Sequence, residues 1–118
     1  MQLELTLKKI LDSGNIDIFI HSVTLPITYK SVKDLSWDEY QKHINLQTKS
    51  FLQIIQSFIP CMTKNKGKII SILTSYTVGT PPNSISNYVS AKYSLLITLV
   101  CFLLQIQHDV ISIQIINH

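Results

Sequence analysis

The stretch KIISILT, residues 68–74, decides the fold, because β-branched residues fill it and a glycine turn at Gly67 opens it. A similar run of Ile, Phe and Val covers residues 16–23, and a third covers residues 109–116. Runs that are apolar on both faces are typical of strands buried inside a parallel sheet. We therefore expect three buried strands.

Helical patterns separate these strands. Ser36 and Glu39 have the spacing of a capping box, and apolar residues follow at helical spacing up to an expected helix end at residues 60–64. A loop rich in Gly, Pro and Asn covers residues 77–87, and helix formers with a wide apolar surface cover residues 88–107. Alternating strands and helices predict parallel pairing with right-handed crossovers. We expect an α/β fold that is part of a Rossmann-like doubly wound parallel sheet.

The first segment, residues 3–11, leaves two interpretations open. The glycine at residue 14 and the lysines at residues 8 and 9 favour a helix with a capped, cation-bearing end. The alternation of Leu3, Leu5 and Leu7 also permits a strand. No repeat or linker divides the chain, so residues 1–118 are expected to form one domain.

The composition excludes several classes of function. Hydrophobic residues make up 46% of the chain and charged residues 14%, against a usual charged share of about 25%, so some apolar surface is expected to need a partner. The net charge is +3, and the basic stretch at residues 64–68 alternates with turn residues. Nucleic-acid binding needs a clustered basic face, so it is not expected.

The cysteines and the chain start predict a cytoplasmic protein. Cys61 and Cys101 lie in apolar stretches without the spacing of a metal site, so reduced thiols and no metal are expected. The first residues lack the basic start and apolar core of a signal peptide. The apolar run at residues 95–104 is about half the length that crosses a bilayer, so no membrane span is expected.

Candidate catalytic residues follow the second strand. Open α/β sheets bind ligands at the carboxyl ends of their strands, where Ser75 lies. Tyr88 and Lys92 come after the loop and share one face of the next helix. A lysine ammonium near a phenol stabilises the phenolate and so lowers a tyrosine pKa that is ordinarily about 10. The three residues predict an acid–base site for a carbonyl or alcohol, whereas taken alone the Tyr88 and Lys92 pair also fits an ordinary helix surface.

The chain contains a second Tyr-x-x-x-Lys pair, formed by Tyr29 and Lys33. This pair lies in an expected loop after the first strand, and no strand-terminal serine precedes it at the matching distance. We interpret it as a chance match in a solvated loop.

Several motifs together carry a family resemblance. Gly-x-Ile-Asp precedes the first strand at residues 14–17, Ile-Asn-Leu lies on the following helix at residues 44–46, and Gly-Lys-Ile-Ile-Ser-Ile opens the next strand. Serine, a loop and Asn-Tyr-x-x-Ala-Lys at residues 87–92 then follow in order. This order resembles the short-chain dehydrogenase/reductase family over nearly all 118 residues. Ser75 also precedes Tyr88 by the spacing common in that family.

The resemblance implies an oxidoreductase that uses NAD or NADP and a small carbonyl or alcohol substrate, for example a 3-oxoacyl or other ketone. It implies Tyr88 as the catalytic acid/base, and Lys92 as its partner and as a ligand of the nicotinamide ribose. It further implies Ser75 as the residue that binds the substrate carbonyl, and Asn45 as the holder of a relay water. His21 stands where the family has the first residue of Asn-Asn-Ala-Gly, which places it beside the cofactor. An ordinary helix asparagine and a hydrogen-bonded structural histidine remain alternatives for Asn45 and His21.

The chain also departs from the family pattern. Its three glycines, at residues 14, 67 and 79, are too dispersed to form the glycine-rich loop that approaches a pyrophosphate. The resemblance thus lacks the glycine-rich βαβ half, and we expect a truncated form with an exposed sheet edge and marginal stability. The alternatives are a catalytically inactive fragment, an association module acting through its apolar helices, or a decayed reading frame. In the family the helices near residues 37–63 and 88–107 build the subunit interface, which predicts a homo-oligomer.

Overall fold

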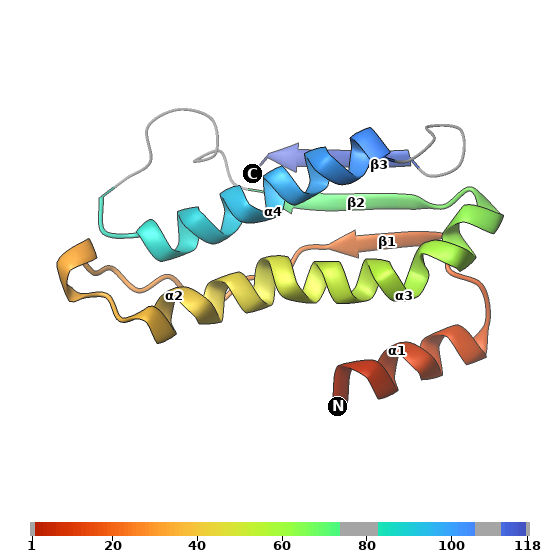
Figure 1. The fold of residues 1–118 in the computed structure, drawn as a ribbon, viewed down its shortest axis with the longest axis horizontal. Helices are drawn as coiled ribbons and strands as arrows, with labels where there is room; N and C mark the ends of the chain where they lie inside the picture. Colours follow the sequence, from red (N-terminus) through yellow and green to blue (C-terminus); the bar gives the residue numbers. More distant parts are fainter. Residues whose placement is uncertain (1, 74–82, 106–111, 118) are drawn as a thin grey trace.

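Three parallel strands form the sheet of the protein (Figure 1). The computed structural model describes residues 2–73, 83–105 and 112–117. The strands β1 (Ile18–His21), β2 (Lys68–Leu73) and β3 (Ser112–Asn117) lie in the order β1-β2-β3, with Phe19 opposite Ile69 and Ile69 opposite Ile113. The predicted α/β fold with a partial doubly wound sheet is confirmed.

Helices precede and connect the strands. Helix α1 (Gln2–Ser13) leads into β1, so the first segment is a helix and the strand alternative was wrong. Helix α2 (Trp37–Ile44), a π-helical turn η2 (Asn45–Lys49) and helix α3 (Ser50–Asn65) connect β1 to β2, after a short 3-10 turn η1 (Val32–Asp34). Helix α4 (Ser86–Gln105) leads from β2 to β3. The expected loop at residues 77–87 lies mostly outside the described residues, and its last two residues belong to α4.

The hydrophobic core lies between one face of the sheet and the helices. It joins side chains of all three long helices to alternate strand residues, since successive strand side chains point to opposite faces. Its buried members are Leu7, Phe51, Ile55, Phe58, Met62, Ile69, Leu73, Leu95 and Leu99. On the other side of β1, Ile18 and Ile20 are 59% and 56% exposed. Among the described elements, the helices therefore cover one face of the sheet.

Two local signals fix the helix that connects β1 to β2. The capping box starts α2 as predicted: the Glu39 backbone N–H donates to Ser36 Oγ at 3.2 Å, and the Ser36 N–H donates to Glu39 Oε2 at 2.8 Å. At the other end Lys66 adopts a left-handed conformation, and the Gly67 N–H donates to Met62 O at 2.8 Å. A Cβ at Gly67 would lie 2.8 Å from Met62 Cε. A side chain at this position would also lie 3.1 Å from Asp17 O, so glycine fits the turn from α3 into β2 without displacing its neighbours.

Helix α4 is longer than the apolar run seen in the sequence, and by length and composition alone it could cross a membrane. Core helices of soluble proteins meet the same test. Here α4 packs on the sheet through Leu95 and Leu99, which are 0% exposed, and it also buries Asn87 and Lys92. Its apolar composition follows in part from this packing, so it is weak evidence for a membrane span.

Candidate active site

A cavity of about 220 Å³ lies at the carboxyl ends of β1 and β2. The segment after β1, the end of β2 and the start of α4 line it, with residues Ser22, Val23, Thr24, Ile72, Leu73, Tyr88 and Lys92. This is the edge at which open α/β sheets bind their ligands. Tyr88 and Lys92 thus lie together in the place that the sequence predicted.

Tyr88 and Lys92 lie one turn apart on α4, as expected from their spacing. Lys92 Nζ lies 6.0 Å from the centroid of the Tyr88 ring and donates a hydrogen bond to Ile72 O at 3.2 Å. The side chain is 4% exposed, and this burial holds the pKa of Lys92 below its usual value. A buried ammonium beside a phenol can stabilise negative charge on the phenol oxygen.

His43 is a neighbour of Tyr88 that the sequence analysis did not identify. Its ring lies edge-on to the Tyr88 ring, with centroids 6.2 Å apart and planes at 87°. His43 is buried, which lowers its pKa, and its Nδ1 has no hydrogen-bond partner among the described residues. The Tyr40 hydroxyl and Ser86 Oγ also share a 2.5 Å hydrogen bond, so α2 holds the start of α4 by two contacts.

The structure does not bring the Asn45 side chain to Tyr88 and Lys92. Asn45 is exposed, begins the π-helical turn and is not among the residues that line the cavity. Its backbone N–H donates to Gln41 O and Lys42 O. The buried polar residue of this turn is Gln47, which is 1% exposed.

His21 ends β1 with its side chain in the core rather than in the cavity lining. It is 2% exposed, packs its ring 5.3 Å from that of Phe51, and forms a 2.9 Å hydrogen bond from Nε2 to Gln47 O. Burial lowers the pKa of His21, the hydrogen bond to Gln47 opposes this, and the charge of Lys92 adds to the lowering. The residues that reach the cavity from this segment are the next three, 22–24.

The remaining predicted residues have simple outcomes. Ser75 lies outside the described residues. Tyr29, in the second Tyr-x-x-x-Lys pair, is 72% exposed, and Lys33 lies in the exposed 3-10 turn η1. Within residues 2–73, 83–105 and 112–117, no three His, Cys, Asp or Glu side chains are grouped as metal ligands.

The two buried histidines predict a loss of stability in mild acid. The histidines of the unfolded chain take up protons near pH 6.5, whereas burial lowers the pKa of His21 and His43 in the folded protein, so they take up protons only at a lower pH. The unfolded state then binds more protons than the folded state, so the free energy of unfolding should fall as the pH is lowered below 6.5. For each histidine the decrease is up to ~1.4 kcal/mol per pH unit. Urea unfolding at pH ~7 and ~5.5 measures this change.

His43→Phe is the matched variant for this measurement. It keeps an aromatic ring against Tyr88 and removes the Nδ1 atom that lacks a partner, so it should be about 1 kcal/mol more stable than the parent protein. It should also show a smaller loss of stability in acid. An equal loss in both proteins would assign the acid effect to groups other than His43.

Comparisons with known proteins identify the family and the fold of the chain. A family model described as enoyl-(acyl carrier protein) reductase matches residues 2–103. No curated protein matches the sequence. The fold is similar to an alcohol dehydrogenase from Thermococcus sibiricus complexed with 5-hydroxy-NADP, with a TM-score of 0.84 and 18% identity over 98% of this chain and 48% of that one.

Two further solved structures show the same coverage. A metagenomic short-chain oxidoreductase in complex with NADP has a TM-score of 0.87 and 16% identity, over 98% of this chain and 52% of that one. A halohydrin dehalogenase bound to ethyl (2S)-oxiran-2-ylacetate has a TM-score of 0.81 and 18% identity, over 95% of this chain and 46% of that one. At these identities the similarity shows the fold, and the chain spans about half the length of the structures that it matches.

Proposed function

The chain belongs to the short-chain dehydrogenase/reductase family, and we propose that it carries the acid–base site of an NAD(P)-dependent oxidoreductase that interconverts a carbonyl and an alcohol. The observation that carries this proposal is the buried Lys92 ammonium beside Tyr88 in a cavity at the strand ends. Among the described residues, the buried ammonium has one backbone acceptor, Ile72 O. A buried cation destabilises a fold unless it is well paired, and such groups are concentrated at functional sites.

Each residue has a defined part in the proposed reaction. The nicotinamide group supplies or accepts the hydride when bound. Tyr88 donates the proton to the substrate oxygen during carbonyl reduction and accepts it during alcohol oxidation, since its side chain lines the cavity. Lys92 stabilises the phenolate that remains and, as in the family pattern, would bind the nicotinamide ribose. Ser75 would bind the same substrate oxygen as Tyr88.

The described residues fit one end of the cofactor. The cavity presents the Lys92 ammonium and the hydroxyl-bearing residues Ser22, Thr24 and Tyr88, which suit the hydroxyl groups of a ribose. Gly67 lies at the amino end of β2, opposite the cavity, and Gly14 precedes β1. Neither can form a pyrophosphate loop at the cavity. We therefore propose that the nicotinamide end binds here, and that a glycine-rich unit supplied by a separate segment or chain would hold the diphosphate. His21 would act on the cofactor only through the backbone that leads to residues 22–24.

Calorimetry of the purified full chain with NADH and NADPH in parallel tests this proposal. We expect weak binding to the folded chain, because only one end of the cofactor has a site. The titration is repeated with Lys92→Ala, which should abolish the binding. A folded chain that binds neither nucleotide would contradict the proposed cofactor site.

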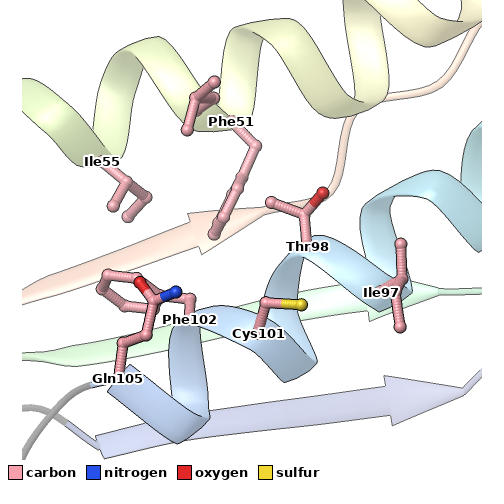
Figure 2. Close-up of a pocket in the computed structure, with 8 residues that line it drawn as sticks. Phe51, Ile55, Ile97, Thr98, Cys101, Phe102 and Gln105 are labelled. Carbon is pink, nitrogen blue, oxygen red and sulfur yellow. The ribbon is translucent and has the colours of Figure 1, made fainter.

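We also propose that the outer face of α3 and α4 binds a second copy of the chain. An apolar groove of about 280 Å³ lies between these helices, and Figure 2 shows Phe51 and Ile55 of α3 directed toward Phe102 of α4. Large apolar side chains on the same two helices are exposed: Leu52, Ile97, Val100 and Leu104. Of these, Leu52 and Ile97 also line the groove. Exposed apolar patches mark protein interfaces. This observation equally favours the alternative function, a cofactor-free association module.

Ile97→Glu is expected to convert the proposed dimer into a monomer, because a carboxylate at the centre of an apolar interface would be desolvated without a partner. Light scattering after size-exclusion chromatography measures the mass. Leu5→Glu is the matched control, since both side chains are 59% exposed and Leu5 lies on α1. A parent chain that is monomeric at high concentration would contradict this interface.

A further inference from the structure

The helix between β1 and β2 buries a polar residue where its apolar pattern predicts a hydrophobic one. Its buried positions are His43, Gln47, Phe51, Ile55, Phe58 and Met62. The first three steps are four residues long, and on a regular α-helix each such step would rotate the buried face by about 40°. The wider π-helical turn, in which the Ser50 N–H donates to Asn45 O, absorbs this rotation. Gln47 consequently points into the protein and Asn45 points out.

Gln47 forms two hydrogen bonds with the end of β1 and the residues that follow it. Its backbone carbonyl accepts from His21 Nε2 at 2.9 Å, and its side-chain Nε2 donates to Val23 O at 2.5 Å. Gln47 and His21 are 1% and 2% exposed. One residue of the π-helical turn thus holds the chain on both sides of Ser22. Single π-helical turns inside α-helices are frequent at functional sites.

These contacts act on the wall of the candidate active site. Ser22, Val23 and Thr24 line the cavity together with Tyr88 and Lys92, and all three are exposed. Within the part of the chain that the structure describes, the Val23 carbonyl is the atom of this segment that the helix holds by a hydrogen bond. The segment follows a four-residue strand and contains no helix or strand of its own. Its position therefore depends on contacts made by residues outside it.

We propose that Gln47 is a positioning residue of the active site: it holds residues 22–24 at the distance from Tyr88 and Lys92 that the nicotinamide end requires. The inference rests on the proposed function of this cavity. In this proposal Gln47 is the residue of the helix that supports the active site. The family resemblance implied a different role on the same helix, a water relay held by Asn45. The Gln47 side-chain amide donates one hydrogen bond through Nε2, but its buried Oε1 has no partner among the described residues. A buried polar atom without a hydrogen bond destabilises the folded protein, so its presence calls for an explanation such as a role at the active site.

The test compares Gln47→Met with two controls by NMR on the full chain. Methionine has nearly the length of glutamine and cannot donate to Val23 O, so the backbone order parameters of residues 22–24 should fall from about 0.85 to below ~0.6. Gln56→Met, on an exposed position of α3, and Asn45→Ala should leave these order parameters unchanged. In the parent protein His21 should be the tautomer with its proton on Nε2, because Gln47 O is an acceptor.

The outcomes separate this inference from the proposed function. Unchanged order in Gln47→Met, an equal loss in Asn45→Ala, or the Nδ1–H tautomer of His21 would overturn the positioning role. The tautomer is measured in the parent chain, so it decides the question even if Gln47→Met does not fold. Loss of order without NADH or NADPH binding by the parent chain would support the positioning role and contradict the proposed function. Where the parent chain binds, Gln47→Met should weaken binding roughly tenfold.

Discussion

Leu95→Ala is expected to unfold the protein or to lower its free energy of unfolding by about 2 to 5 kcal/mol. Leu95 is 0% exposed and belongs to the core between α4 and the sheet. Truncation removes the transfer free energy of its side chain and leaves a cavity that close-packed neighbours fill only in part. A core built against one face of a three-stranded sheet has little stability in reserve. Urea unfolding followed by far-UV circular dichroism measures the change.

Leu5→Ala is the matched control for this experiment. It makes the same substitution outside the proposed dimer interface, at a position of α1 that is 59% exposed. Its truncation should change the free energy of unfolding by no more than about 0.5 kcal/mol. Equal losses in the two variants would show that α4 does not pack on the sheet through Leu95. The comparison also tests whether the apolar side chains of α4 stabilise the protein by packing in the core.

Lys92→Met is expected to reduce hydride transfer by about 10² to 10⁴-fold while leaving the melting temperature unchanged or higher. The ammonium is 4% exposed, with its pKa lowered by burial, so replacing it with an apolar side chain of similar length relieves a desolvation cost. The loss of its hydrogen bond to Ile72 O offsets part of that gain. Opposite effects on activity and stability distinguish a functional residue from a structural one.

The measurement is the oxidation of NADH or NADPH by a panel of small ketones, in the form of the protein that binds the nucleotide. Tyr88→Phe should show a loss of similar size, because it removes only the hydroxyl that exchanges the proton. Lys64→Met, at an exposed position on α3, is the control and should keep full activity. A Lys92→Met protein that fails to fold would instead assign Lys92 to the structure of the site.

The sequence predicted that Tyr88 and Lys92 lie together because their geometry is local. Tyr88 and Lys92 lie four residues apart on one helix, and the strand before them ends at the predicted edge of the sheet. The sequence did not predict the surroundings of the pair, since these come from α2 and from the segment after β1. In the sequence, His43 and Gln47 do not differ from other polar residues of a helix. Their burial in the folded protein is what identifies them as part of the surroundings of the site.

The orientation of the Asn45 side chain could not be predicted from its motif, and its expected relay role stays a prediction. The motif Ile-Asn-Leu placed Asn45 on the helix correctly, but which face it occupies depends on the rotation of the helix about its axis. One π-helical turn changes that rotation, and packing against the sheet selects the turn because it keeps Phe51, Ile55 and Phe58 in the core. No local spacing rule contains this information.

Taken by itself, the sequence determined the order of the three strands and of the two helices that connect them, their parallel pairing, and the place of Tyr88 and Lys92 at the strand ends. It left the type of the first segment open. The features that it determined follow from hydrophobic periodicity, a capping box and glycine turns, which act over a few residues. Tertiary structure alone decided that His43 contacts Tyr88, that His21 faces the core, and that Gln47 holds the wall of the cavity. Each of these contacts joins residues 24 to 45 positions apart. Their geometry is set by how the helices pack on the sheet, which depends on the whole core at once.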